Sequence, residues 1–328
     1  MKYEYDKLKK QFYDKNSADI DGVKLNKIFY LVEKAVKTNN KDFISYDNII
    51  STGKNFEADG KLNKNDYNEL LFNVYKTWWN NWLEPQKEDK NTYVGEKIQA
   101  ILRDETLNPN THENEVRNDI VEIMEYVDPE RLLSNAWYFQ NGNFVLFNVK
   151  DFYANKGKKL LCDVRLYLDI KPKNIAKLAN ILVEDAIKND LPLLFKIAIN
   201  KNRNDNVVLY TNFEEFDEIV NLVERTKENY PELFEGCKVK NPIMATYKKY
   251  MGFGEEPLGM GSYTSNRVEV LEYMFNKLSE EYKNNPSSLT KENMQKHFLK
   301  GCYYNSINPK MFYKNVELSK IHEEIKEK

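Results

Sequence analysis

The sequence predicts an α+β protein in which a helical N-terminal half packs on a mixed or antiparallel sheet with flanking helices. Apolar residues recur at helical spacing through the first half of the chain, and the pattern changes to strand-like alternation after about residue 140. Beyond that point the expected order is strand, helix, strand, strand, helix. We therefore expect a boundary near residue 138, with a helical region over residues 1–138 and an α+β domain with a helical C-terminal tail over 139–328.

Helices are expected in the first half wherever one face of the segment is apolar. Over 23–37, for example, Leu25, Ile28, Val32 and Ala35 share one face. Asp128 and Pro129 favour a short helix through Ala136, because Asp accepts from free backbone N–H groups and Pro is tolerated in the first turn. The other expected helices cover 65–83, 92–103 and 113–126.

Residues 55–66 resemble a calcium-binding loop, in which oxygen ligands alternate around a central glycine. Gly60 stands at the turn, but the closing ligand is Asp66 where such loops carry glutamate, and no second loop is evident. We expect a polar loop here, with a calcium site as the alternative. The side chains at ligand positions are those of Asn55, Glu57, Asp59 and Asn63.

The second half alternates strands and amphipathic helices. Over 163–170, Val164 and Leu166 face one side while Arg165 and Tyr167 face the other. Further strands are expected over 143–152, 193–199, 207–210 and 243–250. The expected helices cover 172–188, 213–230 and 263–282. The glycine-containing segment 252–261 is expected to be a loop in which Glu255 and Glu256 are solvated.

Composition excludes several classes of function. The net charge of −2 arises from charges of mixed sign, which is unlike a general nucleic-acid binder. Three cysteines fit neither a zinc pattern nor a disulfide framework, and no metal site is expected from them. The N-terminus lacks an apolar signal and no apolar run is long enough to span a bilayer. We expect a cytoplasmic protein, exported only by a system that reads no hydrophobic signal.

Several basic residues in the second half are candidates for anion binding. Arg165 and Tyr167 share one face of a strand, and Arg203 lies in a loop before another strand. Arg267 stands near a helix start, where free N–H groups attract anions. Lys196 interrupts an otherwise apolar strand, so it faces either solvent or a cleft in which burial would lower its pKa. Paired guanidinium donors match phosphate oxygens, and a phosphorylated substrate would suit this set.

Ordered sequence blocks over roughly residues 140–275 resemble the HopA-like family. That family includes type III-secreted effectors of plant pathogens and the lyase components of class V lanthipeptide synthetases, and it is distantly similar to bacterial phosphothreonine lyase effectors. The blocks are Val164-Arg-Leu-Tyr-Leu-Asp-Ile-Lys-Pro, Leu193-Leu-Phe-Lys-Ile, Arg203-Asn-Asp-Asn-Val-Val-Leu-Tyr, Gly252-Phe-Gly-Glu-Glu-Pro and Gly261-Ser-Tyr-Thr-Ser-Asn-Arg.

The resemblance implies β-elimination of phosphate from a phosphothreonine or phosphoserine residue, which leaves a dehydroamino acid. It assigns the base to Lys196 and phosphate binding to Arg203 and Arg267. No histidine occurs between His112 and His297, so Tyr167 takes the part of the leaving-group acid. Three further substrate-binding candidates complete the site: Arg165, Tyr210 and Tyr263.

The resemblance implies no metal or organic cofactor. The mixed charges and the lack of a long apolar run predict no nucleic-acid and no membrane partner. The substrate would be a phosphorylated peptide or protein. A peptide-modifying pathway would add a kinase partner and a precursor peptide, whose leader the helical first half would bind. Trp78, Trp79 and Trp82 would serve that purpose, or form part of the core.

Two functions stay open at this point. One is the lyase, which predicts that Lys196, Arg203 and Arg267 converge on one cleft. The other is a non-catalytic effector or binding protein that uses the same fold to bind a protein partner. A Lys196 side chain pointing away from the two arginines would favour the second function.

Overall fold

The structure is a computed structural model of the chain, and it describes residues 2–51, 136–141, 144–149, 162–198, 203–258 and 261–318. Several predictions lie outside the described residues. They are the loop 55–66, the helices over 65–83, 92–103 and 113–126, the start of the short helix at Asp128, and the tryptophans at 78, 79 and 82.

One antiparallel sheet of eight strands forms the centre of the described protein. Its strand order is β1-β7-β8-β4-β6-β5-β3-β2, and every neighbouring pair is antiparallel. The strands are β1 (Ile20–Asp21), β2 (Ala136–Asn141), β3 (Phe144–Val149), β4 (Val164–Leu168), β5 (Leu193–Ala198), β6 (Val207–Thr211), β7 (Ala245–Tyr247) and β8 (Met251–Glu255).

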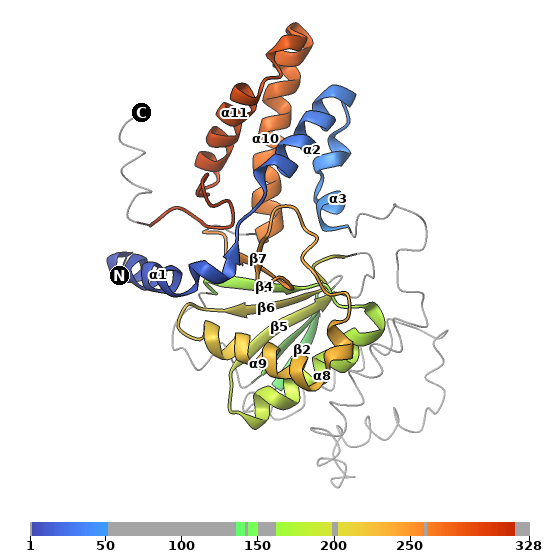
Figure 1. Ribbon diagram of the computed structural model, residues 1–328, viewed down its shortest axis with the longest axis vertical. Coiled ribbons are helices and arrows are strands. Elements are labelled where there is room, and N and C mark those ends of the chain that lie inside the picture. Colours follow the sequence, from blue (N-terminus) through green and yellow to red (C-terminus); the bar gives the residue numbers. More distant parts are fainter. Residues whose placement is uncertain are drawn as a thin grey trace, which may run out of the picture.

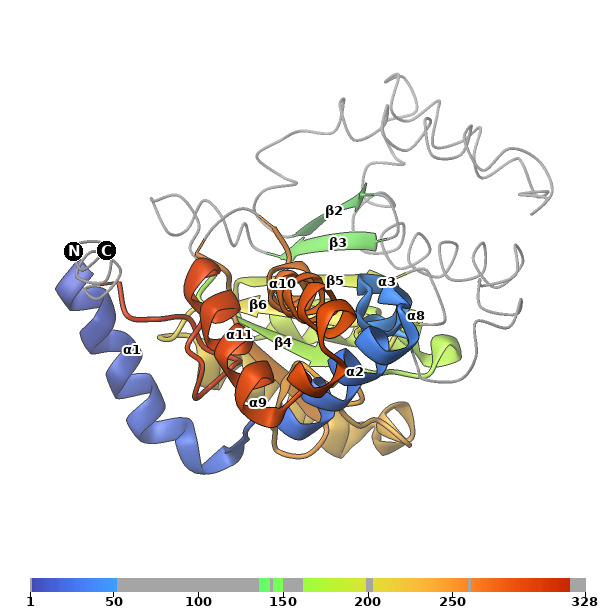
Figure 2. The same ribbon diagram turned by 90° about the horizontal axis from the view of Figure 1, so that it is seen from above.

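Helices cover both faces of this sheet (Figure 1). Helices α8 and α9 pack on one face, and α10, α11, α2 and α3 stand on the other, as the view from above also shows (Figure 2). The predicted α+β class is confirmed. The helices are α1 (Lys2–Asn16), α2 (Leu25–Thr38), α3 (Tyr46–Ile50), α8 (Pro172–Lys188), α9 (Phe216–Asn229), α10 (Tyr263–Asn284) and α11 (Lys291–Tyr304).

The alternation in β4 divides the interior into two cores, as the sequence predicts. Val164, Leu166 and Leu168 lie in the core beneath α8 and α9. Tyr167 lies in the other core, with apolar residues of α2, α10 and α11. Because successive side chains of a strand point to opposite faces, Arg165 and Tyr167 share the α10 face.

Local sequence explains where the helices that border the site begin. Pro172 stands in the first turn of α8, where its missing N–H costs nothing. The Ser262 hydroxyl accepts from the backbone N–H of Ser265 and caps α10. The predicted helices 172–188, 213–230 and 263–282 are therefore confirmed, with α9 beginning three residues later than predicted.

The structure corrects the segment that was expected to be a strand over 243–250 and a loop over 252–261. A turn with positive φ at Lys248 and Lys249 splits the first segment, so β7 is short and β8 follows immediately. Gly254 belongs to β8, where it pairs with Arg165 of β4. The Tyr263 ring lies against it, and an added Cβ would meet Tyr263 Cε2 at 2.3 Å. Glycine thus permits close packing here and does not mark a loop.

Several further elements were not predicted, and α3 is one of them. β2 begins at Ala136, where a helix was expected to end, and it spans residue 138. Helix α1 and β1 precede the first predicted helix, and β1 joins the sheet at the edge formed by β7. Within the described part of the chain, no helix is long and apolar enough to cross a lipid bilayer.

Candidate functional site

Polar and aromatic side chains gather on the α10 face of the sheet. Tyr167 on β4 and Lys196 on β5 both flank Val208 of the strand between them, β6. Adjacent strands are about 4.8 Å apart, so the two backbones are about 10 Å apart. Arg165 lies directly opposite Tyr210. We call this group the sheet-face cluster, and it comprises Tyr46, Phe144, Arg165, Tyr167, Lys196, Arg203, Asp205, Tyr210 and Glu256.

Lys196 is the single lysine of this cluster. It is half-buried, and its side chain lies among aromatic rings. Its Nζ is 4.0 Å from the ring centroid of Phe144 and 5.8 Å from that of Tyr210. No carboxylate of the described residues forms an ion pair with it. Burial lowers the pKa of Lys196 to about 8, with the charges of Arg165 and Arg203 acting in the same direction and those of Asp205 and Glu256 opposing.

Arg165 is held by the segment that follows β8. Its Nε and Nη2 donate to the two carboxylate oxygens of Glu256, which makes the ion pair bidentate. Its Nη2 also donates to the carbonyl of Gly261 at 3.4 Å. The guanidinium carbon lies 5.1 Å from the Tyr210 ring centroid. Glu256 thus holds the Arg165 side chain in place and neutralises part of its positive charge.

Arg203 is held in the same way, but within its own loop. Its Nε and Nη2 donate to the two oxygens of Asp205 at 2.9 and 3.0 Å. Its Nη2 also donates to the Tyr46 hydroxyl of α3 at 3.1 Å. Burial raises the pKa of Asp205, and the positive charge of Arg203 opposes that rise. The guanidinium carbon lies 4.6 Å from the Phe144 ring centroid, so one ring contacts both Lys196 and Arg203.

Asparagines hold the Arg203 loop in place. The backbone N–H of Asn204 donates to the carbonyl of Ile50 at 2.8 Å, and its side chain donates to Ser51. Asn206 both accepts from the N–H and donates to the carbonyl of Ile170. The loop therefore docks the end of α3 beside the sheet-face cluster, and this docking places Tyr46 there.

Tyr167 is buried beside Arg165. Burial raises the pKa of Tyr167 well above its usual value, while the charge of Arg165 opposes this rise. A phenol near a guanidinium is a proton donor whose anion the guanidinium stabilises. Tyr210 is half-buried between Arg165 and Lys196, as the cation–ring distances show.

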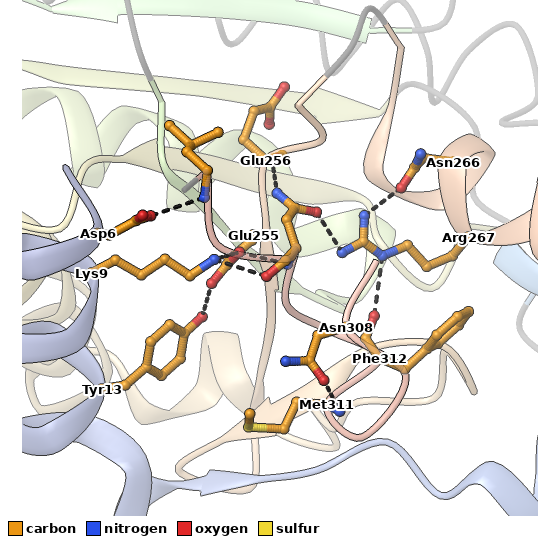
Figure 3. Close-up of polar contacts among 12 residues, drawn as sticks. Asp6, Lys9, Tyr13, Glu255, Glu256, Asn266, Arg267, Asn308, Met311 and Phe312 are labelled. Carbon is orange, nitrogen blue, oxygen red and sulfur yellow. Dashed lines mark hydrogen bonds and ion pairs between the residues drawn. The ribbon is translucent and has the colours of Figure 1, made fainter. Parts of the chain in front are cut away.

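Arg267 and Tyr263 make their hydrogen bonds outside the sheet-face cluster. Arg267 is fully buried, and it donates to the carbonyl of Phe312 at 3.2 Å and to Asn315 Oδ1 at 3.1 Å (Figure 3). Its guanidinium carbon lies 4.4 Å from the Tyr263 ring centroid. The Tyr263 hydroxyl donates to the carbonyl of Ile243 at 2.7 Å, and burial raises its pKa to about 12. Both residues therefore fasten α10 to the chain around it.

The structure thus brings together Arg165, Tyr167, Lys196, Arg203 and Tyr210. Arg267 lies outside this group, and Tyr263 borders it, with its ring centroid 6.0 Å from that of Tyr167. Sequence reasoning missed four members of the cluster: Tyr46, Phe144, Asp205 and Glu256. Asp205 stands two residues after Arg203, a spacing that would have suggested their pairing. Tyr46 gave no signal, because α3 and the Arg203 loop are far apart in sequence. Glu256 was expected to be solvated and instead pairs with Arg165, while its neighbour Glu255 is buried.

The cluster combines three cationic groups with two carboxylates, and its cations lie on one face. Such a set can bind an anion and hold a lysine ready to accept a proton. In the described part of the chain no group of three or more histidine, cysteine or acidic side chains is placed to hold a metal ion.

A comparison with known families bears on this region. Residues 134–271 are similar to the HopA1 effector protein family. The predicted resemblance to HopA-like effectors is confirmed. This HopA1-like region, as we call residues 134–271, contains β2 to β8, α8, α9 and the start of α10. It also contains every member of the sheet-face cluster except Tyr46.

Solved structures similar to this chain include two effector proteins of Pseudomonas syringae. One, from pathovar tomato strain DC3000, is 11% identical, with a TM-score of 0.49 over 88% of this chain and 96% of its own. The other, from pathovar syringae strain 61, is 12% identical, with a TM-score of 0.45 over 89% of this chain and 97% of its own. No curated protein matches the chain.

Proposed function

We propose that the sheet-face cluster catalyses β-elimination of phosphate from phosphothreonine or phosphoserine residues of a peptide or protein. The observation that carries this proposal is the state of Lys196. Its ammonium is half-buried, pairs with no carboxylate of the described residues, and has its pKa lowered to about 8. A lysine in this state is partly neutral near pH 7 and is able to act as a general base.

The step that we propose balances as follows. Lys196 Nζ takes the α-proton of the phosphorylated residue, and the electron pair of the Cα–H bond forms the Cα=Cβ bond. The Cβ–O bond breaks and its electron pair leaves with the phosphate. Tyr167 gives a proton to the departing oxygen, and Arg165 stabilises the resulting phenolate. Lys196 and Tyr167 then exchange protons with water and return to their starting states.

Arg165 and Arg203 are the proposed phosphate-binding residues. Both guanidiniums lie beside Lys196, and developing charge on the leaving phosphate would be stabilised by fixed cations in a partly dry site. Arg267 has no part in this step, because it donates to the carbonyl of Phe312 and to Asn315. Tyr263 has none either, because its hydroxyl donates to the carbonyl of Ile243. A lyase of this kind needs a kinase that phosphorylates its substrate, such as a precursor peptide in lanthipeptide synthesis.

Mass spectrometry of phosphothreonine and phosphoserine peptides incubated with the protein tests the proposal. A lyase leaves a double bond and a phosphatase leaves a hydroxyl, so the two products differ by the mass of one water. We expect the double-bond product with the natural protein and its loss with Lys196→Met. Lys177→Met on α8 is the matched control, since that exposed lysine pairs with Glu232 on the opposite face.

One observation favours a second function, that of an effector that binds a partner without catalysis. Arg165 and Arg203 are already paired in bidentate fashion with Glu256 and Asp205. A phosphate would have to compete with these carboxylates for both guanidiniums. If no phosphopeptide is converted by the natural protein, the cluster serves to bind, and the lyase proposal is wrong.

A further inference from the structure

Phe144 is the one aromatic residue that contacts both Lys196 and Arg203 in the sheet-face cluster. The Lys196 Nζ lies 4.0 Å from its ring centroid and the Arg203 guanidinium carbon lies 4.6 Å from it. The ring is half-buried and comes from β3, a strand that carries neither cation. The pairing of Phe144 with Ala198 and of Leu146 with Lys196 fixes the ring against β5.

An aromatic ring attracts cations through the negative charge on its face. A ring that contacts two cations attracts both of them, and this attraction offsets part of their mutual repulsion. Arg203 stays protonated at all relevant pH values, so its contact with the ring is constant. Lys196 loses its attraction to the ring when it gives up its proton.

At Lys196 the ring therefore opposes burial and the charges of the two arginines. Burial and the charges of Arg165 and Arg203 favour the neutral amine, whereas the charges of Asp205 and Glu256 favour the ammonium. Those groups come from β4, from the loop before β6 and from the segment after β8. Tyr210 of β6 supplies a second ring at a longer distance of 5.8 Å.

Building on the proposed function, we propose that Phe144 is a positioning residue of the lyase: its ring holds the Lys196 ammonium beside the Arg203 guanidinium and sets the proton affinity of the lysine. Without the ring, repulsion from the two guanidiniums is less opposed. The lysine then releases its proton at lower pH and is free to turn away from Arg203.

The sharpest test changes the charge on the ring face and leaves its shape nearly the same. In Phe144→pentafluorophenylalanine the face of the ring repels cations. We expect the pKa of Lys196 to fall by about half a unit or more, the size that loss of a cation–ring contact implies. The pKa is measured from the pH dependence of Lys196 acylation by an amine-specific reagent, followed by peptide mass spectrometry.

Three further variants sharpen the result. Phe144→Tyr keeps the ring and should leave the pKa of Lys196 unchanged, whereas Phe144→Leu removes the ring and should lower it. Phe29→pentafluorophenylalanine is the matched control, because that ring packs on Phe298 in another part of the molecule. An equal pKa of Lys196 in the natural, fluorinated and leucine proteins would overturn the proposal.

Acylation reports on Lys196 whether or not the protein eliminates phosphate, so the two proposals can fail separately. A lowered pKa in a protein without lyase activity supports the role of Phe144 in tuning the lysine and contradicts the proposed function. Lyase activity with an unchanged pKa supports the function and contradicts the role of Phe144. Where both hold, the rising limb of the pH–rate profile moves to lower pH in the fluorinated protein.

Discussion

At the scale of single residues, Lys196 lowers the free energy of unfolding, and its proposed function accounts for this loss of stability. Its pKa is lowered from 10.5 to about 8, so the folded protein binds this proton less tightly than the unfolded chain. A group of this kind destabilises the fold most below pH 8, and the cost falls as pH rises from about 8 toward 10.5. Catalytic sites commonly carry such a cost.

Lys196→Met should therefore stabilise the protein at pH 7 while it abolishes elimination. Removing the charge relieves burial and the repulsion from two arginines, which we expect to raise the free energy of unfolding by about 1 kcal/mol after allowance for solvent screening. Urea unfolding at pH 7 and pH 10 checks this, and the difference from the natural protein should shrink at the higher pH. A less stable variant at pH 7 would show that Lys196 makes favourable contacts outweighing its burial.

Four of the five cluster residues that the sequence predicted stand on strands, and the fifth, Arg203, lies in the loop before β6. Arg165 and Tyr167 were placed on one face, and the structure confirms that placement. What the sequence could not supply were the partners that lie far away along the chain. Glu256 is 91 residues from Arg165, and Tyr46 is 157 residues from Arg203, so no local pattern joins them.

At the scale of elements, β8 and α10 depend on one close contact. Gly254 lies under the Tyr263 ring, which the hydroxyl bond to Ile243 holds in place. A stretch with several glycines is typical of a loop, and for this reason the sequence did not predict β8. The glycine is needed because a neighbouring helix presents a large side chain to the strand.

Gly254→Ala should consequently be strongly destabilising. The added Cβ would lie 2.3 Å from Tyr263 Cε2, so the buried ring or the start of α10 has to move, at a cost of about 1–3 kcal/mol. Gly22→Ala is the matched control, because its Cβ would meet its nearest neighbour, Tyr313 Cε1, at an ordinary 3.8 Å. Thermal unfolding of both variants measures the difference. Equal melting temperatures would mean that the Tyr263 ring moves aside without a loss of stability.

At the scale of the whole molecule, a buried network joins the two ends of the chain to the sheet. Glu255 of β8 is 1% exposed, and it accepts from Lys9 Nζ at 2.7 Å, from the Tyr13 hydroxyl at 2.6 Å and from the backbone N–H of Asn315 at 2.6 Å (Figure 3). Arg267 donates to the side chain of Asn315 in turn. Lys9 and Glu255 are 246 residues apart, and no sequence pattern indicates their pairing.

A double-mutant cycle at Lys9 and Glu255 measures this network. Glu255→Gln leaves the ammonium of Lys9 buried without its charge partner, which should cost about 3 kcal/mol. Lys9→Met combined with Glu255→Gln should cost less than the sum of the two single changes. Hydrogen exchange over 2–16 should accelerate in Glu255→Gln. Additive costs and unchanged exchange would show that the ion pair does not hold α1.

The central claim, that Lys196 is a base in a β-elimination site, is tested most directly by the pH dependence of the elimination rate. The substrate is a phosphothreonine peptide at saturating concentration, and the product is the dehydroamino acid. We predict a rate that rises tenfold per pH unit below the pKa of Lys196 and levels off near pH 8, and no elimination by Lys196→Met at any pH. Elimination that persists in Lys196→Met with the same profile, or that is absent from the natural protein throughout, would contradict the account.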